Sequence, residues 1–250
     1  MNFVVPGVCA GLRTRSGENP PAPGFGAIQD YTPLTCNGDW LGASKGTVHQ
    51  SPDGLLSALS GNYFWRDKEL SDQALRRGPH EALATAYRKY GESLLEKLAG
   101  RFSLVVWDPH GKRGLVATDR FAQMQVYWSS HRDALWVAPS ADLVLACAAR
   151  PAELSNQGIY HYLFFHMVPS PGSIFHGVNK LPAAHALRIG NGDITPFCYW
   201  VPTFSEHGSA RGARAGETML QLLNAAVVQL DTGRDTGACL SGGLDSSSVA

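Results

Sequence analysis

Hydrophobic residues recur at helical spacing in the stretch that follows Pro79. One face of a helix there would hold Leu83, Ala86, Tyr87, Tyr90, Leu94, Leu95 and Leu98. Proline is favoured in the first turn of a helix, and glycine often follows its end. The pattern therefore predicts one amphipathic helix that begins at Pro79 and ends near Gly100.

Apolar runs separated by turn residues follow this helix and predict antiparallel strands. The runs are 102–107, 114–118, 125–128, 134–138, 186–189 and 195–199. The last two flank Asn191-Gly192, a dipeptide typical of tight hairpins. Short helices are predicted over 142–149 and after Ser155, which is suited to an N-cap.

The two ends of the chain differ from this middle part. Residues 1–60 are rich in Gly, Pro and Ser, and they predict one strand followed by long turns and loops. After Trp200 the residues become polar and predict a linker, followed by a helix over 219–230 and a short strand over 236–240. We expect a domain over 1–200, a linker over 201–216 and the start of a second domain over 217–250.

Composition narrows the choice of partners. The chain has 250 residues, 44% of them hydrophobic, and its 21 basic and 21 acidic residues cancel, so no positive field favours nucleic acid or anionic membranes. No apolar run reaches the ~20 residues needed to cross a bilayer. The five cysteines are widely spaced and lack a C-x-x-C pair, which argues against a disulfide framework and a zinc site. We expect a cytoplasmic protein that binds small molecules or proteins.

The segment Ser-Gly-Gly-Leu-Asp-Ser, placed between a predicted strand and small residues suited to begin a helix, has the pattern of a phosphate-binding loop. Its glycines let the backbone approach phosphate oxygens, and the N-terminus of the following helix favours an anion. We predict that ATP contacts Leu240, Ser241, Gly242, Gly243, Asp245 and Ser246. Asp245 is suited to hold a Mg²⁺ ion that bridges the phosphates. The alternative is a glycine-rich turn that only closes a strand.

This loop differs from the G-x-x-x-x-G-K-[ST] loop, because no lysine is present to reach the outer phosphates. We therefore expect ATP to be cleaved between its alpha and beta phosphates.

Four further segments occur in a recognisable order. They are Leu-Ala-Gly-Arg-Phe-Ser-Leu-Val-Val-Trp-Asp at 98–108, Thr-Asp-Arg-Phe at 118–121, Val-Pro-Ser-Pro-Gly-Ser-Ile-Phe-His-Gly-Val-Asn-Lys-Leu-Pro at 168–182, and Tyr-Trp at 199–200. Together with the loop, they resemble the glutamine-dependent asparagine synthetase family. The resemblance implies an α+β fold, a four-layer αββα Ntn-hydrolase-like sandwich of antiparallel sheets. It also implies that the start of an α/β doubly wound ATP pyrophosphatase domain follows.

The chain departs from this family where the nucleophile of glutamine hydrolysis should lie. The family places a cysteine directly after the initiator methionine, because the freed amine acts as the base. Here Asn2 takes that place, and an alignment of residues 6–12 with the family's C-G-I-x-G start puts Pro6 there instead. Cys9 could serve only after removal of the eight residues before it, and a buried strand cysteine is the alternative.

Two more positions of that site differ. The family's N-G-E-I-Y-N loop corresponds to Ser60-Gly61-Asn62, so the side-chain amide of the oxyanion hole is missing. His80 stands where the family has the carboxylate that binds the glutamine ammonium group. The catalytic residues are therefore unknown, and glutamine hydrolysis is expected to be lost.

The resemblance implies an ATP-dependent ligase that forms an amide through an acyl-adenylate and releases AMP and pyrophosphate. It implies ATP and Mg²⁺ as cofactors and a small-molecule or peptide carboxylate as substrate, and a homodimer is left open. One alternative is a cyclase of the beta-lactam synthetase or lasso-peptide type, and another is a non-catalytic scaffold. Since the chain stops one turn into the predicted helix, we expect it to be a fragment of a longer protein.

Overall fold

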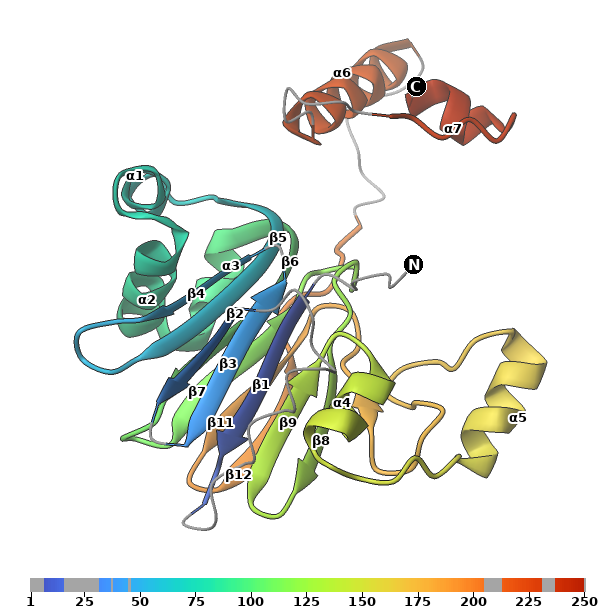
Figure 1. Cartoon of the computed structure of the whole chain (residues 1–250). Helices are drawn as coiled ribbons and strands as arrows, with labels where there is room; N and C mark the ends of the chain where they lie inside the picture. Colours follow the sequence, from blue (N-terminus) through green and yellow to red (C-terminus); the bar gives the residue numbers. More distant parts are fainter. Residues whose placement is uncertain are drawn as a thin grey trace. The chain divides into compact units, whose positions relative to one another are not determined.

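Two six-stranded antiparallel sheets form the body of the first of two compact units, Met1–Val201 and Pro202–Ala250 (Figure 1). The computed structural model describes residues 7–15, 32–36, 38–44, 46–204, 213–230 and 237–249. Among these residues, no helix combines the length and the apolar character that a membrane span requires.

Strands from both halves of the first unit build each sheet. One sheet contains β1 (Gly7–Arg13), β2 (Thr32–Cys36), β3 (Asp39–Ser44), β8 (Tyr127–His131), β9 (Ala134–Ala138) and β10 (Asn179–Lys180), in the order β10-β8-β9-β1-β3-β2. The other contains β4 (Gly46–Gln50), β5 (Leu56–Trp65), β6 (Leu98–Asp108), β7 (Arg113–Thr118), β11 (His185–Gly190) and β12 (Asp193–Cys198), in the order β12-β11-β7-β6-β5-β4. The helices are α1 (Lys68–Arg77), α2 (Pro79–Tyr90), η1 (Gly91–Ser93), α3 (Leu94–Lys97), α4 (Ala141–Cys147) and α5 (Asn156–Phe165).

Three hydrophobic clusters define four layers. The middle cluster joins the two sheets and includes Leu12, Leu41 and Trp107. A second cluster packs α1, α2 and α3 on the sheet that contains β5 and β6, and a third packs α4 on the sheet that contains β8 and β9. The α+β arrangement of four αββα layers is therefore confirmed.

Several elements form where the sequence pattern placed them. β9 spans 134–138 as predicted, and β11 and β12 pair around Asn191 and Gly192, whose φ angles of 54° and 82° suit the tight turn. Ser155 caps α5, because its side-chain oxygen accepts a hydrogen bond from the Gly158 N–H at 3.2 Å.

The prediction of one strand and long loops for residues 1–60 is wrong. β2, β3, β4 and the start of β5 also lie in this region. All six residues of β3 are buried, as are the first five of β5. A strand covered on both faces lacks the alternation of polar and apolar residues by which strands are recognised.

The single helix predicted from Pro79 to Gly100 is also wrong. α2 ends at Tyr90, and the backbone reverses at Gly91, which has φ 56° and ψ −128°. Residues 91–97 then form two short helical turns, and β6 begins at Leu98. The apolar spacing continues across the break because both segments contact the same cluster, which holds Leu83, Leu94 and Leu98.

In the second unit, the described residues contain α6 (Ala213–Leu230) and α7 (Leu244–Val249). The helix predicted at 219–230 forms, but α6 begins four residues inside the predicted linker, which ran to residue 216. The strand predicted over 236–240 is absent from Gly237–Leu240, and Thr236 lies outside the described residues. A strand needs a hydrogen-bonded partner, and no described residue of this unit supplies one.

Candidate functional site

Residues 240–246 make a compact hydroxyl-lined turn that leads into α7 and includes its first three residues. The Ser241 and Ser246 hydroxyl oxygens lie 3.0 Å apart, and the Gly243 N–H donates to the Ser241 hydroxyl at 3.3 Å. The Ser246 hydroxyl also donates to the Gly243 carbonyl at 3.1 Å. These contacts bring Ser241, Gly243 and Ser246 together at the beginning of the helix.

Space lies open in front of this turn. Gly242 has φ 80°, and a Cβ built there would meet nothing within 4 Å. Leu240 and Asp245 are exposed, and Asp245 lies in the first turn of α7. Glycine is required at residue 242 by its backbone angle, and the open space suits the approach of a ligand.

Cys9 lies in the interior of β1, opposite Gly42 of β3, and it is fully buried. It belongs to the cluster that includes Trp40, Trp136 and Val144. Asn2 and Pro6, the other two positions considered for the nucleophile, lie outside the described residues. A thiol packed among aromatic and aliphatic side chains has no access to a substrate.

The residues that match the oxyanion loop lie in β5. The buried Ser60 hydroxyl donates to the Ser44 carbonyl at 2.8 Å and is thereby satisfied within the sheet. Gly61 has φ 120°, and a Cβ there would lie 2.2 Å from the Arg101 carbonyl oxygen. Asn62 is exposed. The fold therefore needs glycine at residue 61 for close strand packing, whether or not the site is catalytic.

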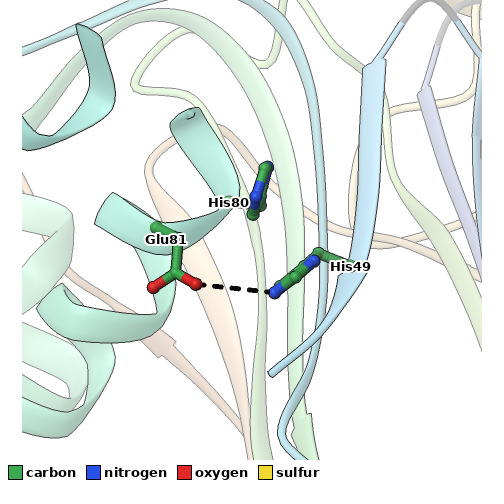
Figure 2. Close-up of side chains that lie close together, drawn as sticks. All are labelled: His49, His80 and Glu81. Carbon is green, nitrogen blue, oxygen red and sulfur yellow. Dashed lines mark ion pairs between the residues drawn. The ribbon is translucent and has the colours of Figure 1, made fainter. Parts of the chain in front are cut away.

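His80 lies beside a second histidine. Its ring centroid is 4.1 Å from that of His49 on β4, and the rings are tilted by 36°. The His49 Nε2 lies 3.8 Å from the Glu81 Oε1, and all three side chains are half-buried. Figure 2 shows these side chains converging from β4 and the first turn of α2.

The surroundings of His49 favour its neutral form. Burial lowers its pKa, and His80 lowers it further, while Glu81 acts in the opposite direction. His49 also lies opposite Ser57 on β5, four residues before Gly61. At about 3.4 Å per residue, that is roughly 14 Å along the strand from the residues that match the oxyanion loop.

Sequence reasoning singled out His80 but missed His49. The strand that presents His49 was not predicted, and 30 residues separate the two histidines, as their numbers show. Only the pairing of β4 with β5 and the packing of α2 on both strands bring them together.

Two family models match the chain. Residues 67–200 match the glutamine amidotransferase domain, and residues 218–250 match asparagine synthase. The first match covers more than half of the chain and defines the class of this domain. The chain belongs to the asparagine synthetase-like family, with a glutamine amidotransferase domain and the start of a synthase domain.

Three relatives show the range of the similarity. The putative glutamine-hydrolyzing asparagine synthetase of Mycobacterium tuberculosis is 25% identical over 216 residues, which are 80% of this chain and 33% of the relative. Asparagine synthetase 1 of Bacillus subtilis is 26% identical over 170 residues, 68% of this chain and 27% of the relative. The amidase chry2 of Gibberella zeae is 26% identical over 217 residues, 81% of this chain and 31% of the relative. The chain thus spans about a third of the length of these relatives.

Proposed function

We propose that the protein to which this chain belongs is an ATP-dependent, amide-forming ligase whose amidotransferase domain does not hydrolyse glutamine. The observation that supports the ligase is the turn at 241–246, in which two hydroxyl groups lie 3.0 Å apart at the start of α7. Residues 218–250, which contain this turn, match the asparagine synthase model.

The proposed residues fit a pyrophosphate group. Ser241 and Ser246 would turn their hydroxyl donors from their contacts within the turn toward the phosphate oxygens, and Asp245 offers an exposed carboxylate for Mg²⁺. In the proposed reaction, a substrate carboxylate attacks the alpha phosphorus of ATP while pyrophosphate leaves, and an amine then displaces AMP to form the amide.

The proposed loss of glutamine hydrolysis rests on three described positions. Cys9 is buried, the Ser60 hydroxyl is committed to the Ser44 carbonyl, and His80 faces His49. None of these groups offers a nucleophile, an amide donor for an oxyanion or a carboxylate for the substrate ammonium. Nitrogen would then come from free ammonia or from an amine of the substrate.

The ligase is tested with a protein that carries this chain together with a complete synthase domain. Aspartate and ATP are supplied with ammonia, with glutamine or with no added amine, and AMP and the amide product are measured. We expect AMP to form when ammonia is supplied. Adding glutamine should not increase the amount of AMP above that formed with no added amine. Glutamine-dependent turnover would contradict the loss of hydrolysis and would also argue against a cyclase, whereas AMP without added amine would report hydrolysis of the adenylate by water. Absence of AMP in every case would contradict the aspartate assignment.

Variants of the loop test its role in the same assay. Asp245→Asn and Ser246→Ala should each lower AMP formation by at least about tenfold, the scale of one lost contact to a charged group. Ser248→Ala is the matched control, since its hydroxyl only donates to the Leu244 carbonyl inside α7. Equal activity in all three variants would argue against a role for this loop.

The chain itself suffices to test glutamine hydrolysis. Incubated with glutamine, it should release no glutamate above the buffer rate. Asparagine synthetase 1 of Bacillus subtilis, which is named as glutamine-hydrolyzing, serves as the positive control.

A further inference from the structure

His49, His80 and Glu81 form a group of metal-binding side chains that the proposed ligase does not use. One ring nitrogen from each histidine and one carboxylate oxygen from Glu81 all lie within 4.8 Å of one another. They come from two elements that pack together, β4 and the first turn of α2. Within the described part of the chain, this is the one such group of three.

One polar atom of this group, the His49 Nε2, is buried and lacks a hydrogen-bond partner among the described residues. Its distance of 3.8 Å from the Glu81 Oε1 is too long for a hydrogen bond. A buried ring nitrogen without a partner is costly, so an additional group between these atoms would stabilise the arrangement.

We propose that His49, His80 and Glu81 bind one Zn²⁺ ion, with a water molecule as the fourth ligand. Zinc binds imidazole nitrogen at about 2.0–2.1 Å and carboxylate oxygen at about 2.0–2.2 Å. Tetrahedral ligands at these lengths lie roughly 3.3 Å from one another. The His49 Nε2 and the Glu81 Oε1 would therefore close by about 0.5 Å, and no pair of ligand atoms would close by more than about 1.5 Å, distances on the scale of side-chain rotation.

The ligand set decides between metals. Two imidazoles and one carboxylate suit Zn²⁺ and its first-row neighbours, whereas Mg²⁺ and Ca²⁺ prefer oxygen ligands. The sequence argument against a zinc site was based on the cysteines alone, and the proposed site differs from that expectation because its ligands are two histidines and a glutamate. The His49 and Glu81 side chains keep 28% and 30% of their surface exposed, so an ion can enter from solvent and retain a water.

The absence of a side chain at Gly78 leaves room for the His80 ring. A Cβ at residue 78 would lie 2.6 Å from the His80 Cε1 and 3.0 Å from its Nδ1. Glycine there lets the ring lie against the start of α2, toward His49. Glu81 follows directly, so two of the three ligands come from one helical turn, and bound zinc would tie that turn to β4.

The test is a titration of the metal-free, untagged full chain with ZnCl₂ by isothermal calorimetry. Every protein tested, including the reference, carries both Cys198→Ser and Cys239→Ser, because these two thiols are exposed and would bind zinc themselves. We expect one equivalent of Zn²⁺ and a raised Tm. His49→Gln, His80→Gln and Glu81→Gln should each weaken binding by more than about tenfold, since even loss of an outer-shell partner costs about 10–100-fold.

His176→Gln is the matched control, because that side chain is exposed on a loop outside this group. Thermal melting without metal shows whether each variant is folded. Co²⁺ provides a readout that needs no variant, since a tetrahedral site gives strong visible absorption that the aqueous ion lacks. Equal zinc affinity in the control and in all three folded variants would overturn the proposal, as would a Co²⁺ spectrum unchanged from that of the aqueous ion.

Discussion

The carboxylate of Asp39 accepts a hydrogen bond from the Arg13 backbone N–H at 2.6 Å and another from the Trp107 indole N–H at 2.8 Å. Arg13 ends β1, Asp39 begins β3 and Trp107 lies in β6, so this buried side chain connects the two sheets. Burial raises the pKa of Asp39, although both hydrogen bonds act to lower it.

Asp39→Ala should lower the free energy of unfolding by about 2–4 kcal/mol, because it leaves two donors without an acceptor inside the sandwich. Urea denaturation followed by tryptophan fluorescence measures the change. Asp193→Ala is the control, since its carboxylate is 78% exposed and lies 3.8 Å from Arg15, and such a pair contributes little. Equal stability of the two variants would contradict the role given to Asp39.

The same carboxylate gives a pH dependence with a defined sign. Its folded-state pKa lies above the ordinary value of 3.8, so the native state binds more protons than the unfolded state between these two values. The stability from Asp39 is therefore greatest below pH 3.8 and declines as the pH rises through the folded-state pKa. We expect the difference in unfolding free energy between wild type and Asp39→Ala to shrink as the pH rises from about 4 to about 7. An increase of this difference over the same range would contradict the raised pKa of Asp39.

Cysteine burial separates the five thiols into reactive and protected groups. Cys198 and Cys239 are exposed, Cys36 is half-buried, and Cys9 and Cys147 are buried. Burial raises the pKa of Cys147 to about 12, which leaves almost no thiolate at neutral pH. Iodoacetamide labelling followed by mass spectrometry should show rapid modification of Cys198 and Cys239, and modification of Cys9 and Cys147 only in denaturant. Rapid labelling of native Cys9 would favour it as a nucleophile after all.

At the scale of elements, the sequence predicts those that have a local signal. Asn191-Gly192 places the β11–β12 hairpin, and Ser155 places the start of α5. α1 was not predicted: it is a helix of ten residues, and Leu70 is its one buried residue. β3 gives no alternating pattern, since all of its residues are buried. Amphipathic patterns reveal elements with one covered face, and β3 is covered on both.

The break between α2 and α3 depends on Gly91, whose φ of 56° and ψ of −128° are essentially restricted to glycine. Gly91→Ala should lower the free energy of unfolding by about 1–3 kcal/mol through backbone strain alone, because a Cβ there meets nothing within 4 Å. Gly190→Ala is the matched control, as residue 190 is equally open and has no positive φ. Chemical denaturation compares the two variants. A Gly91→Ala variant as stable as the control would show that the backbone at residue 91 can adopt other angles without loss of stability.

At the scale of the whole molecule, the two candidate sites differ in how far the sequence reveals them. The residues of the 240–246 loop are contiguous, so their order alone indicates a phosphate-binding turn. The group of His49, His80 and Glu81 depends on a strand that the pattern misses and on a helix whose placement only the fold determines. A site assembled from distant elements becomes visible only with their packing.

The two units also differ in what stabilises them. The first has three buried clusters, whereas none of the described residues of the second unit is buried. Along α6, the exposed apolar residues include Met219, Leu222 and Val228. Because helices in proteins depend mostly on tertiary packing, α6 and α7 of this chain should open far more readily than the sheets.

Amide hydrogen exchange of the 250-residue chain, read by mass spectrometry, tests this difference. We expect α6 and α7 to exchange at least about a hundredfold faster than β5, β6 and β7, corresponding to about 2.7 kcal/mol less opening free energy. Met219→Ser should leave the Tm of the first unit unchanged, because that side chain is 58% exposed. Leu104→Ser, at a fully buried position of β6, is the contrasting variant and should lower the Tm strongly. Protection of α6 equal to that of β6 would show that the second unit is stabilised by contacts other than the burial of its described residues.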